Sequence, residues 1–384
     1  MDYGLILIRY GELALKSDKV RSRFERKLVK NISASIDGEI TRTRGRIFIE
    51  PKNFDYALEK LDKIFGIVSY SPVKKTETDK EKIKETLTEY TKHLIDEGIL
   101  NENKTFGIRC RRVGNHDFTS QEMAAYCGSV VIDTIPLKVD LTNPDVEIFV
   151  EVRENNTYIF HEKIDGPGGL PLGSQGKVIC LISSGIDSPV ATYLMMKRGC
   201  EVIALHFDNN PYTTPQCKAN FNDLIDVLEE YASGVPIKRY AIPYGHYLQE
   251  CKSKGPEKMT CVLCKSGMYK TAEKLAKKLG ALAIVDGSSV GQVASQTLKN
   301  ILATRYGVGV PILSPLIGMD KLETSKIAEE IGTFEISKRD DGGCKAVPKY
   351  PETYAELDRL EEAKKAVCQD EELNNAIKNI ERIK

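Results

Sequence analysis

Residues 177–191, KVICLISSGIDSPVA, contain the pattern that decides the fold of the C-terminal half of the chain. The run begins with apolar and β-branched residues, which predict a buried strand. Two serines and a glycine follow at 183–185. A helical pattern then opens, with Ser188 expected as its cap and Pro189 in its first turn. A helix N-terminus offers unpaired N–H groups and the positive end of a dipole, so this junction predicts a phosphate-binding turn.

The segments that follow repeat the alternation of strand and helix. EVIALHF (201–207) precedes a helical pattern at 218–234, and ALAIVDGSS (281–289) follows another at 266–280. Strands that alternate with helices predict an α/β domain with a parallel sheet and helices on both faces. In such open sheets ligands bind at the carboxyl ends of the strands, which is where residues 183–185 lie.

The turn by itself leaves alternatives open. The sequence contains neither G-x-x-x-x-G-K-[ST] nor G-x-G-x-x-G, so a Walker loop and a dinucleotide fingerprint are both excluded. An ordinary strand–turn–helix junction explains the same residues without any ligand.

The N-terminal half has a different organisation. Residues 1–55 read as strand, helix and strand pair, and residues 56–165 mix helices with strands, so this half is predicted to be α+β. The Gly- and Pro-rich run at 166–176 is interpreted as a linker, and the α/β domain is expected to occupy 177–384.

Composition narrows the class of protein. The formal net charge is zero, and residues 1–50 hold more Lys and Arg than Asp and Glu, which is compatible with a polyanionic partner or with an ordinary charged surface. No apolar run reaches the length of a membrane span, and the N-terminus lacks a signal-peptide pattern, so we expect a cytoplasmic protein without a membrane partner. In a reducing compartment, clustered cysteines among the ten present indicate metal binding or catalysis.

The turn at 183–188 resembles the pyrophosphate loop of the PP-loop ATPases, written S-G-G-x-D-S, with Ser184 in the place of a glycine. That resemblance implies that the enzyme adenylates an oxygen of its substrate. It also implies that Asp187 acts near the phosphates through Mg²⁺, which commonly binds one or two carboxylates together with phosphates.

Further segments, in the same order, are similar to the tRNA 4-thiouridine synthetase (ThiI) family. They are RYGELALK (9–16), RSRFERKL (21–28), VDLTNPDVEIFVEVR (139–153), GPGGLPLG (166–173), GQVASQTLKN (291–300) and SPLIGMDKLE (314–323). The resemblance implies a PP-loop ATPase domain preceded by ferredoxin-like and THUMP domains. It also implies a homodimer that binds tRNA.

The reaction that this resemblance implies is thiolation of uridine 8 of tRNA. ATP adenylates O4 of the uracil, and sulfur then displaces AMP to give 4-thiouridine. Asp187 and Cys344 are the implied catalytic residues. The implied ATP contacts are Leu181, Ile182, Ser183, Ser184, Gly185, Asp187, Ser188, His206, Phe207, Lys265, Gly287 and Gln296.

Three cysteines are candidates for the sulfur chemistry. Cys261 and Cys264 have the C-x₂-C spacing that lets two thiolates bind one metal centre, and Cys344 lies in DGGCKAVPKYP, where Gly343 stands in place of a cysteine often found in the family. Three thiolates suit a [4Fe–4S] cluster with one open iron, as in the methanogen-like members that this sequence resembles. The alternatives are zinc with Cys251 as a fourth ligand, a redox pair in which Cys344 carries a persulfide, and an incidental pair.

The sulfur donor is therefore expected to be free sulfide or a persulfide carrier. Many bacterial members carry a C-terminal rhodanese domain that delivers persulfide sulfur, and we expect none here. Because that extension is associated with thiamine thiazole synthesis, we do not expect this chain to take part in it.

Candidate tRNA contacts lie in two basic segments of the N-terminal half. They are Lys16 and Arg21 near the first helix and Arg109, Arg111 and Arg112 in IRCRR. Such groups neutralise phosphates, although a solvated charged surface explains them equally well. The rival functions are thiolation of another tRNA position, amidation of a small molecule, and RNA binding with a decayed ATP site.

Overall fold

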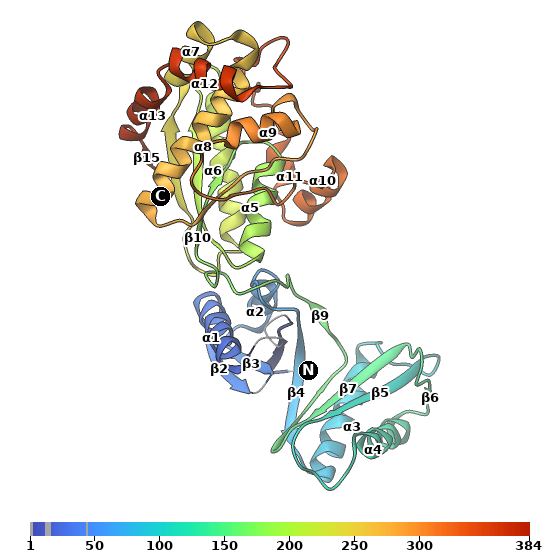
Figure 1. The fold of residues 1–384 in the computed structure, drawn as a ribbon. Helices are drawn as coiled ribbons and strands as arrows, with labels where there is room; N and C mark the ends of the chain where they lie inside the picture. Colours follow the sequence, from blue (N-terminus) through green and yellow to red (C-terminus); the bar gives the residue numbers. More distant parts are fainter. Residues whose placement is uncertain (1–2, 12–16, 44) are drawn as a thin grey trace. The chain divides into compact units, whose positions relative to one another are not determined.

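The computed structural model describes residues 3–11, 17–43 and 45–384, and it divides into two compact units. The first unit comprises residues 1–21, 35–62 and 67–168, and the second comprises 22–34, 63–66 and 169–384. The division falls between Gly168 and Gly169, within the glycine-rich segment, and Figure 1 shows the course of the chain through both units. Among the described residues, no helix is both long and apolar enough to cross a membrane.

The first unit contains, within the described residues, a sheet of nine strands in the order β2-β3-β1-β4-β8-β7-β5-β6, with β9 paired to β4. Its strands are β1 (Leu5–Arg9), β2 (Gly38–Thr43), β3 (Arg46–Pro51), β4 (Ser69–Glu77), β5 (Thr105–Arg112), β6 (Lys138–Val139), β7 (Val146–Val152), β8 (Asn156–Phe160) and β9 (Ile164–Asp165). β4 pairs with β1 through its first half and with β8 through its second half, so one strand runs through both parts of the sheet. The predicted strand pair around Gly45 is confirmed, because Gly45 has a φ of +80° between β2 and β3.

The N-terminal part of the chain also contains helices between these strands. They are α1 (Asp18–Ser35), α2 (Phe54–Leu61), α3 (Lys80–Asp96) and α4 (Ser120–Thr134). In α1, Phe24, Leu28 and Ile32 recur at i+4 spacing, which predicts one apolar face, and all three are buried. Most of α1 belongs to the second unit, where the Asn31 side chain donates a hydrogen bond of 3.2 Å to the Leu172 carbonyl.

The second unit contains, in the part of the chain that is described, a sheet of six strands in the order β14-β13-β10-β11-β12-β15. The strands are β10 (Lys177–Leu181), β11 (Glu201–Asp208), β12 (Lys238–Pro243), β13 (Ala283–Val285), β14 (Ile312–Leu313) and β15 (Glu381–Arg382). The first five run parallel, as predicted, and β15 is antiparallel to β12. Val178 pairs with Val202 and with Ala283, so the carboxyl ends of β10, β11 and β13 reach the same edge.

Helices cover both faces of this sheet, which confirms the predicted architecture (Figure 1). They are α5 (Asp187–Lys197), α6 (Pro215–Glu229), α7 (Gly245–Lys254), α8 (Thr260–Leu279), α9 (Leu298–Arg305), α10 (Lys321–Glu330), α11 (Phe334–Ser337), α12 (Leu357–Ala366) and α13 (Gln369–Lys378), with short 3₁₀ turns at Glu257–Met259 and Ala294–Gln296. Alternate residues of β10 supply two cores, because Val178 and Cys180 pack with α5 and α6, whereas Ile179 packs with α8. The last thirty residues, whose charged composition suggests one terminal helix, do not form one: the chain turns at Cys368, with φ +50°, and forms α12, α13 and β15.

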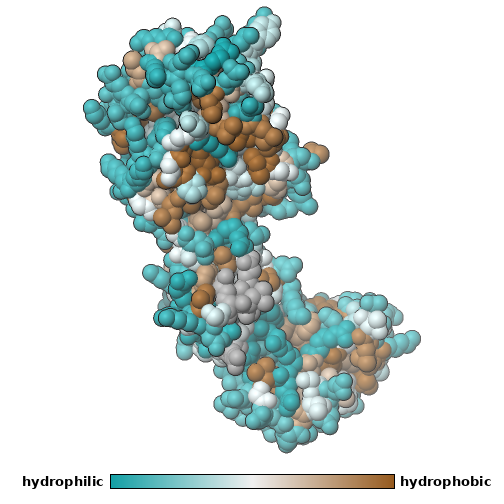
Figure 2. Space-filling model, in the orientation of Figure 1, coloured by the Kyte–Doolittle hydropathy of each residue, from teal (hydrophilic) through white to brown (hydrophobic). Residues whose placement is uncertain are grey.

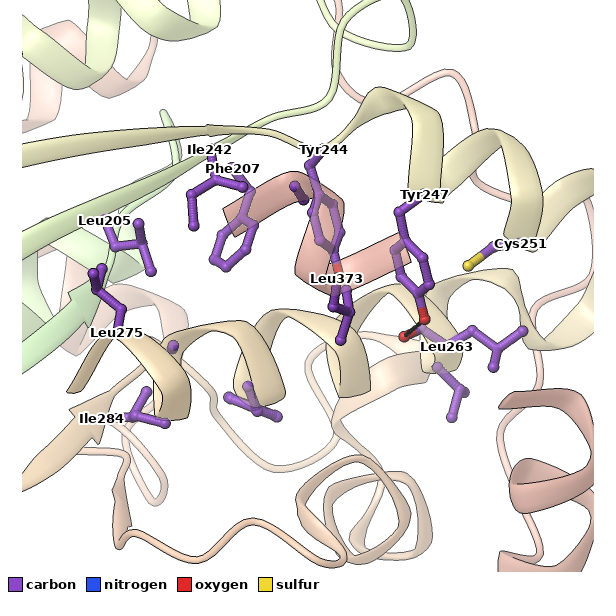
Figure 3. Close-up of a cluster of buried hydrophobic side chains, with 14 of the residues drawn as sticks. Leu205, Phe207, Ile242, Tyr244, Tyr247, Cys251, Leu263, Leu275, Ile284 and Leu373 are labelled. Carbon is purple, nitrogen blue, oxygen red and sulfur yellow. Dashed lines mark hydrogen bonds between the residues drawn. The ribbon is translucent and has the colours of Figure 1, made fainter. Parts of the chain in front are cut away.

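Two tyrosines define the core between β12 and α8. Tyr244 and Tyr247 are buried and point toward α8, where their hydroxyls donate hydrogen bonds to the carbonyls of Cys264 and Leu263 (Figure 3). Gly267 makes this approach possible, because a Cβ there would lie 2.3 Å from the Tyr244 hydroxyl and 2.7 Å from the Tyr247 ring. The first turns of α8, which carry Cys261 and Cys264, are therefore held by packing on these rings.

We expect Gly267→Ala to lower the free energy of unfolding by about 1–3 kcal/mol, because overpacking outweighs the gain in helix propensity. Gly128→Ala is the matched control, since Gly128 also lies within a helix but a Cβ there meets no atom within 4 Å. Thermal and urea unfolding of the full chain would compare the two variants. Equal stabilities for both variants would contradict this account of the tyrosine packing.

Candidate functional site

Two cavities open at the carboxyl edge of the parallel sheet. Their volumes are about 340 Å³ and about 400 Å³. They share the lining residues Leu181, Ser183, Asn209, Met268 and Cys344, so they are neighbouring parts of one site. The site lies beyond the last residues of β10, β11 and β13, which is the position expected for a ligand in an open parallel sheet.

The structure brings together the expected ATP contacts and the three candidate cluster cysteines of this domain. The first cavity is lined by Leu181, Ser183, Asp187, Ser188, Cys261, Cys264, Lys265, Gly287, Gln296 and Cys344, among others. The second is lined by Leu181, Ile182, Ser183, Ser184, Gly185, His206, Phe207 and Cys344, among others. Every expected ATP contact and all three candidate cysteines therefore face one of the two connected spaces.

The turn after β10 is held by a hydroxyl, but not as predicted. Ser188 was expected to cap α5, whereas its Oγ accepts a hydrogen bond from the Ser183 N–H at 3.0 Å and lies 3.2 Å from the Ser183 carbonyl, to which it donates. The expected cap is therefore wrong. The N-cap residue is Ile186, which makes no side-chain cap hydrogen bond. The first N–H groups of α5 thus lack a side-chain acceptor, which leaves a helix terminus suited to an anion.

Gly287 lets the end of β13 approach this helix start. A Cβ at this position would lie 2.8 Å from the Asp187 carbonyl carbon and 2.9 Å from the Ser188 nitrogen. Real Cβ atoms do not approach backbone so closely, so only glycine fits here without moving α5. Close packing of β13 against the phosphate-binding turn therefore depends on this residue.

Asp187 is the first residue of α5, and both of its carboxylate oxygens have partners. Lys321 Nζ lies 2.8 Å from Oδ1, and Gln292 Nε2 donates to Oδ2 at 2.9 Å. Sequence reasoning missed both partners, although they lie within two of the segments that carry the family resemblance, 291–300 and 314–323. A cation at Asp187 would compete with the lysine for the same oxygen.

Lys265 is linked to a buried carboxylate that the sequence did not identify. Lys265 Nζ donates to Ser288 Oγ at 2.9 Å, and that hydroxyl donates to Asp286 Oδ2 at 2.9 Å. Asp286 also accepts hydrogen bonds from Tyr269 and from Ser314. Burial lowers the pKa of Lys265, and the charge of Asp286 opposes that shift. Burial raises the pKa of Asp286, but Lys265 and the hydroxyl donors outweigh it and hold that pKa below its usual range.

His206 lies in the wall of the second cavity and is 5% exposed. Its Nδ1 lies 3.1 Å from the Ile182 carbonyl, which only accepts, so Nδ1 carries the proton and Nε2 remains an acceptor. The ring stacks on Phe221 with a centroid distance of 4.9 Å. Burial lowers the pKa of His206, so the imidazole is neutral at pH 7.

Ser184, which replaces a glycine of the PP-loop pattern, donates a hydrogen bond to the carboxylate of Asp341. Both residues line the second cavity together with Gly343 and Cys344. Asp341 was missed because it lies 157 residues away in the sequence, within a segment that was examined for its cysteine.

The three cysteines share the first cavity with Asp187. Cys261 and Cys264 lie one turn apart at the start of α8, and burial raises the pKa of both thiols, most strongly that of Cys264. Among the described residues, no group of three His, Cys, Asp or Glu side chains is arranged to hold a single metal ion. Cys251, the fourth zinc ligand considered above, does not line the cavity. Cys251 packs in the core instead, and burial raises its pKa to about 12.

The first unit contains a separate basic cavity of about 590 Å³. Its lining includes Arg9, Arg46, Arg109, Arg111 and Lys163, together with Glu147 and Glu151. Arg46 binds Glu151 at 2.9 Å, and Arg109 binds Glu147 at 2.6 Å. Burial and the neighbouring Arg46 lower the pKa of Arg9 to about 10, which still leaves it charged at pH 7. The cations outnumber the acids, so this space favours an anion.

The other predicted RNA contacts have different surroundings. Arg112 donates to the His116 carbonyl at 3.0 Å, and Arg21 forms an ion pair with Asp18. Neither residue lines the basic cavity. Lys16 lies outside the described residues.

Comparisons with known proteins agree with this geometry. The family described as thiamine biosynthesis protein (ThiI) matches residues 173–368, the ThiI ferredoxin-like domain matches 5–71, and the THUMP domain matches 81–162. A protein of Methanobrevibacter smithii called probable tRNA sulfurtransferase is 65% identical over 99% of this chain and 100% of its own length. This chain belongs to the ThiI family.

Two further proteins extend the comparison. A probable tRNA sulfurtransferase of Methanothermobacter thermautotrophicus is 56% identical and covers 97% of this chain and 96% of its own. The crystal structure of a 4-thiouridine synthetase in complex with RNA and bound ATP is 31% identical, covers 99% of both chains and has a TM-score of 0.91. The predicted fold class, a PP-loop α/β domain preceded by ferredoxin-like and THUMP domains, is therefore confirmed.

The buried neutral His206 leads to a prediction about acid stability. Its folded-state pKa lies below the unfolded value near 6.5, so the unfolded chain binds the proton more readily. The contribution to stability is complete above about pH 6.5 and falls by up to about 1.4 kcal/mol per pH unit below it. We expect His206→Asn to remove that part of the slope in urea unfolding between pH 7 and 5. His116→Asn, at a partly exposed site, is the control, and equal slopes for wild type and His206→Asn would refute the assignment.

Proposed function

We propose that this chain is an ATP-dependent tRNA sulfurtransferase that converts uridine 8 to 4-thiouridine. The observation that carries the proposal is that the expected nucleotide contacts and three thiols line the same pair of joined cavities. Membership of the ThiI family supports it, as do the relatives called tRNA sulfurtransferase and the related synthetase crystallised with RNA and ATP.

The first step is adenylation, and the turn after β10 supplies its phosphate site. The free N–H groups at the start of α5 and the small residues at 183–185 hold the phosphates of ATP. The ammonium of Lys265 faces the same cavity and balances negative charge that develops as pyrophosphate leaves. The uracil O4 attacks the α-phosphorus of ATP, and pyrophosphate leaves. O4, which is a poor leaving group by itself, can then depart as part of AMP.

Magnesium fits this site in one position. Asp187 provides a carboxylate at the helix start, and Mg²⁺ usually keeps several waters beside one or two protein oxygens. A magnesium ion bound there would compete with Lys321 for Oδ1.

The thiols fit an iron–sulfur cluster better than a single zinc ion. Structural zinc sites take four ligands around one ion, whereas three cysteines suit a cluster with one open iron, and a cluster separates its cysteine sulfurs more widely. Cys261, Cys264 and Cys344 would hold it, and when bound it would supply an open iron on which sulfide is carried. With sulfide as the donor, the sulfur would attack C4 and AMP would leave. With a persulfide carrier, the outer sulfur would attack C4 as AMP leaves, and a second thiol would then cleave the S–S bond and form a disulfide with the carrier.

RNA binding is assigned to the first unit. The basic cavity at Arg109 and Arg111 suits the phosphate backbone of tRNA. We also infer a homodimer, because apolar side chains of the second unit are exposed around α9, including Leu298 and Leu302 (Figure 2).

Anaerobic reconstitution with iron, sulfide, ATP and tRNA, followed by nucleoside analysis, tests the function. We expect 4-thiouridine at position 8, bound iron and absorbance near 400 nm. Cys344→Ala should lose thiolation but keep tRNA-dependent release of pyrophosphate, and Cys368→Ala, an exposed thiol outside the site, should behave as wild type. Thiolation elsewhere, or AMP formation without tRNA, would favour the rival functions. A preparation that binds neither iron nor sulfide would contradict the proposed iron–sulfur cluster.

Salt dependence tests the RNA surface. We expect tRNA binding to weaken strongly between about 50 and 200 mM salt, and Arg111→Ala to reduce the slope of log K against log salt by about 1. Lys52→Ala serves as a control, because Lys52 is an exposed lysine paired with Asp37 and lies outside the basic cavity. Binding that hardly changes with salt would argue against an electrostatic docking surface.

A further inference from the structure

Two positions at which this chain departs from the family pattern meet at one carboxylate. Ser184, in place of a glycine, donates its hydroxyl to Asp341 Oδ2. Gly343, in place of a cysteine, donates its N–H to Asp341 Oδ1 at 3.0 Å. Burial raises the pKa of Asp341, but these donors outweigh it and hold the pKa below its usual range, so the group accepts both bonds as a carboxylate.

The backbone of Asp341 is held as well. Its carbonyl accepts a hydrogen bond from Thr214 Oγ1 at 2.9 Å, at the N-terminus of α6. Gly342 and Gly343 then take φ values of +73° and +58°, a left-handed turn that side chains disfavour. This turn brings the Gly343 N–H back to the carboxylate that precedes it.

Cys344 therefore lies between two fixed points. Before Cys344, the chain is held through Asp341, and after it the Lys345 N–H donates a hydrogen bond of 2.8 Å to the Tyr212 carbonyl. Cys344 lines both cavities, so its placement decides how its sulfur faces the thiols of Cys261 and Cys264. This segment contains no helix or strand between residues 338 and 356, so the hydrogen bonds on either side of Cys344 fix the local course of the chain.

We propose that Asp341 is a positioning residue: through its hydrogen bond with Ser184, it holds residues 341–345, which include Cys344, against the phosphate-binding turn. The inference rests on the proposed function, because it assigns Cys344 to sulfur delivery. Sulfur transfer needs the sulfur ligand and the adenylated base in a fixed geometry, and small displacements of reacting groups are costly. A glycine at 184 lacks the hydroxyl that makes this link, which gives the substitution of serine a physical reason.

The first test needs no activity. The full-length, reduced, metal-free protein is treated with iodoacetamide, and modification of Cys344 is followed by peptide mass spectrometry, with exposed Cys368 as the internal reference. We expect Asp341→Ala and Ser184→Ala each to raise the Cys344 rate about tenfold, the effect of losing one charge-assisted hydrogen bond. Asp341→Asn should give a smaller rise, because the amide keeps its size and one acceptor.

Asp340→Ala is the matched control. Asp340 lies beside Asp341, and its carboxylate accepts the Gly342 N–H at 2.9 Å, so the variant loses one acid of the same turn but not the link to Ser184. The double variant Ser184→Ala/Asp341→Ala should react no faster than Asp341→Ala alone, because Asp341→Ala already lacks the bond to Ser184. Additive effects, or equal rates for Asp341→Ala and Asp340→Ala, would overturn the proposal.

Kinetics separate this role from direct substrate binding. We expect Asp341→Ala to lower the kcat of thiolation about tenfold while the KM for ATP changes less than about threefold. A KM for ATP that rises tenfold would instead make Asp341 a ligand of the nucleotide or its magnesium ion, and would reject the positioning role. If the wild-type protein formed no AMP with tRNA and a sulfur donor, the proposed function would be wrong. The alkylation experiment tests the placement of Cys344 separately, because it requires no activity.

Discussion

The parallel pairing of β10 with β11 and β13 is the constraint on which the site depends. Because Val178, Val202 and Ala283 are in register, the three strands end at one edge, and their following turns meet there. The N-terminus of α5 lies at this edge, and Gly287 lets β13 approach it within the distance of a backbone contact. The anion site is therefore made mostly of backbone, whose position is fixed by the sheet.

Three titratable groups near this edge, Lys265, Asp286 and His206, are held in place by buried hydrogen bonds. Lys265 and Asp286 are largely withdrawn from water and are linked through Ser288, so neither charge is left alone in the interior. His206 is kept neutral by burial and oriented by the Ile182 carbonyl. The two neighbouring cavities therefore present the Lys265 ammonium, the N-terminus of α5 and the neutral His206 imidazole before a ligand binds. Little rearrangement is needed to accept a phosphate.

The local elements were predictable where the sequence repeats a clear period. The strands at 177–181 and 201–208 and the helices after them follow from β-branched runs and apolar spacing. Ser188 shows where this reasoning fails. A hydroxyl at a helix start predicts a cap, but in this turn the Ser183 N–H lies nearer, and the side chain bonds there instead. The C-terminal residues do not form a single helix, because Cys368 adopts a left-handed conformation that divides them into two helices. The hydrophobic period of the sequence does not reveal such a residue.

By itself, the sequence determined the order of the domains, the parallel sheet and many of the residues that line the site, because these follow from patterns of neighbouring residues and from resemblance to the ThiI family. Only the tertiary structure decided how distant residues pair. Ser184 bonds to Asp341 across 157 positions, Asp187 to Lys321, and Arg46 to Glu151. The physical reason is that periodicity reports which face of an element is buried, whereas a hydrogen bond depends on the register and packing of separate elements.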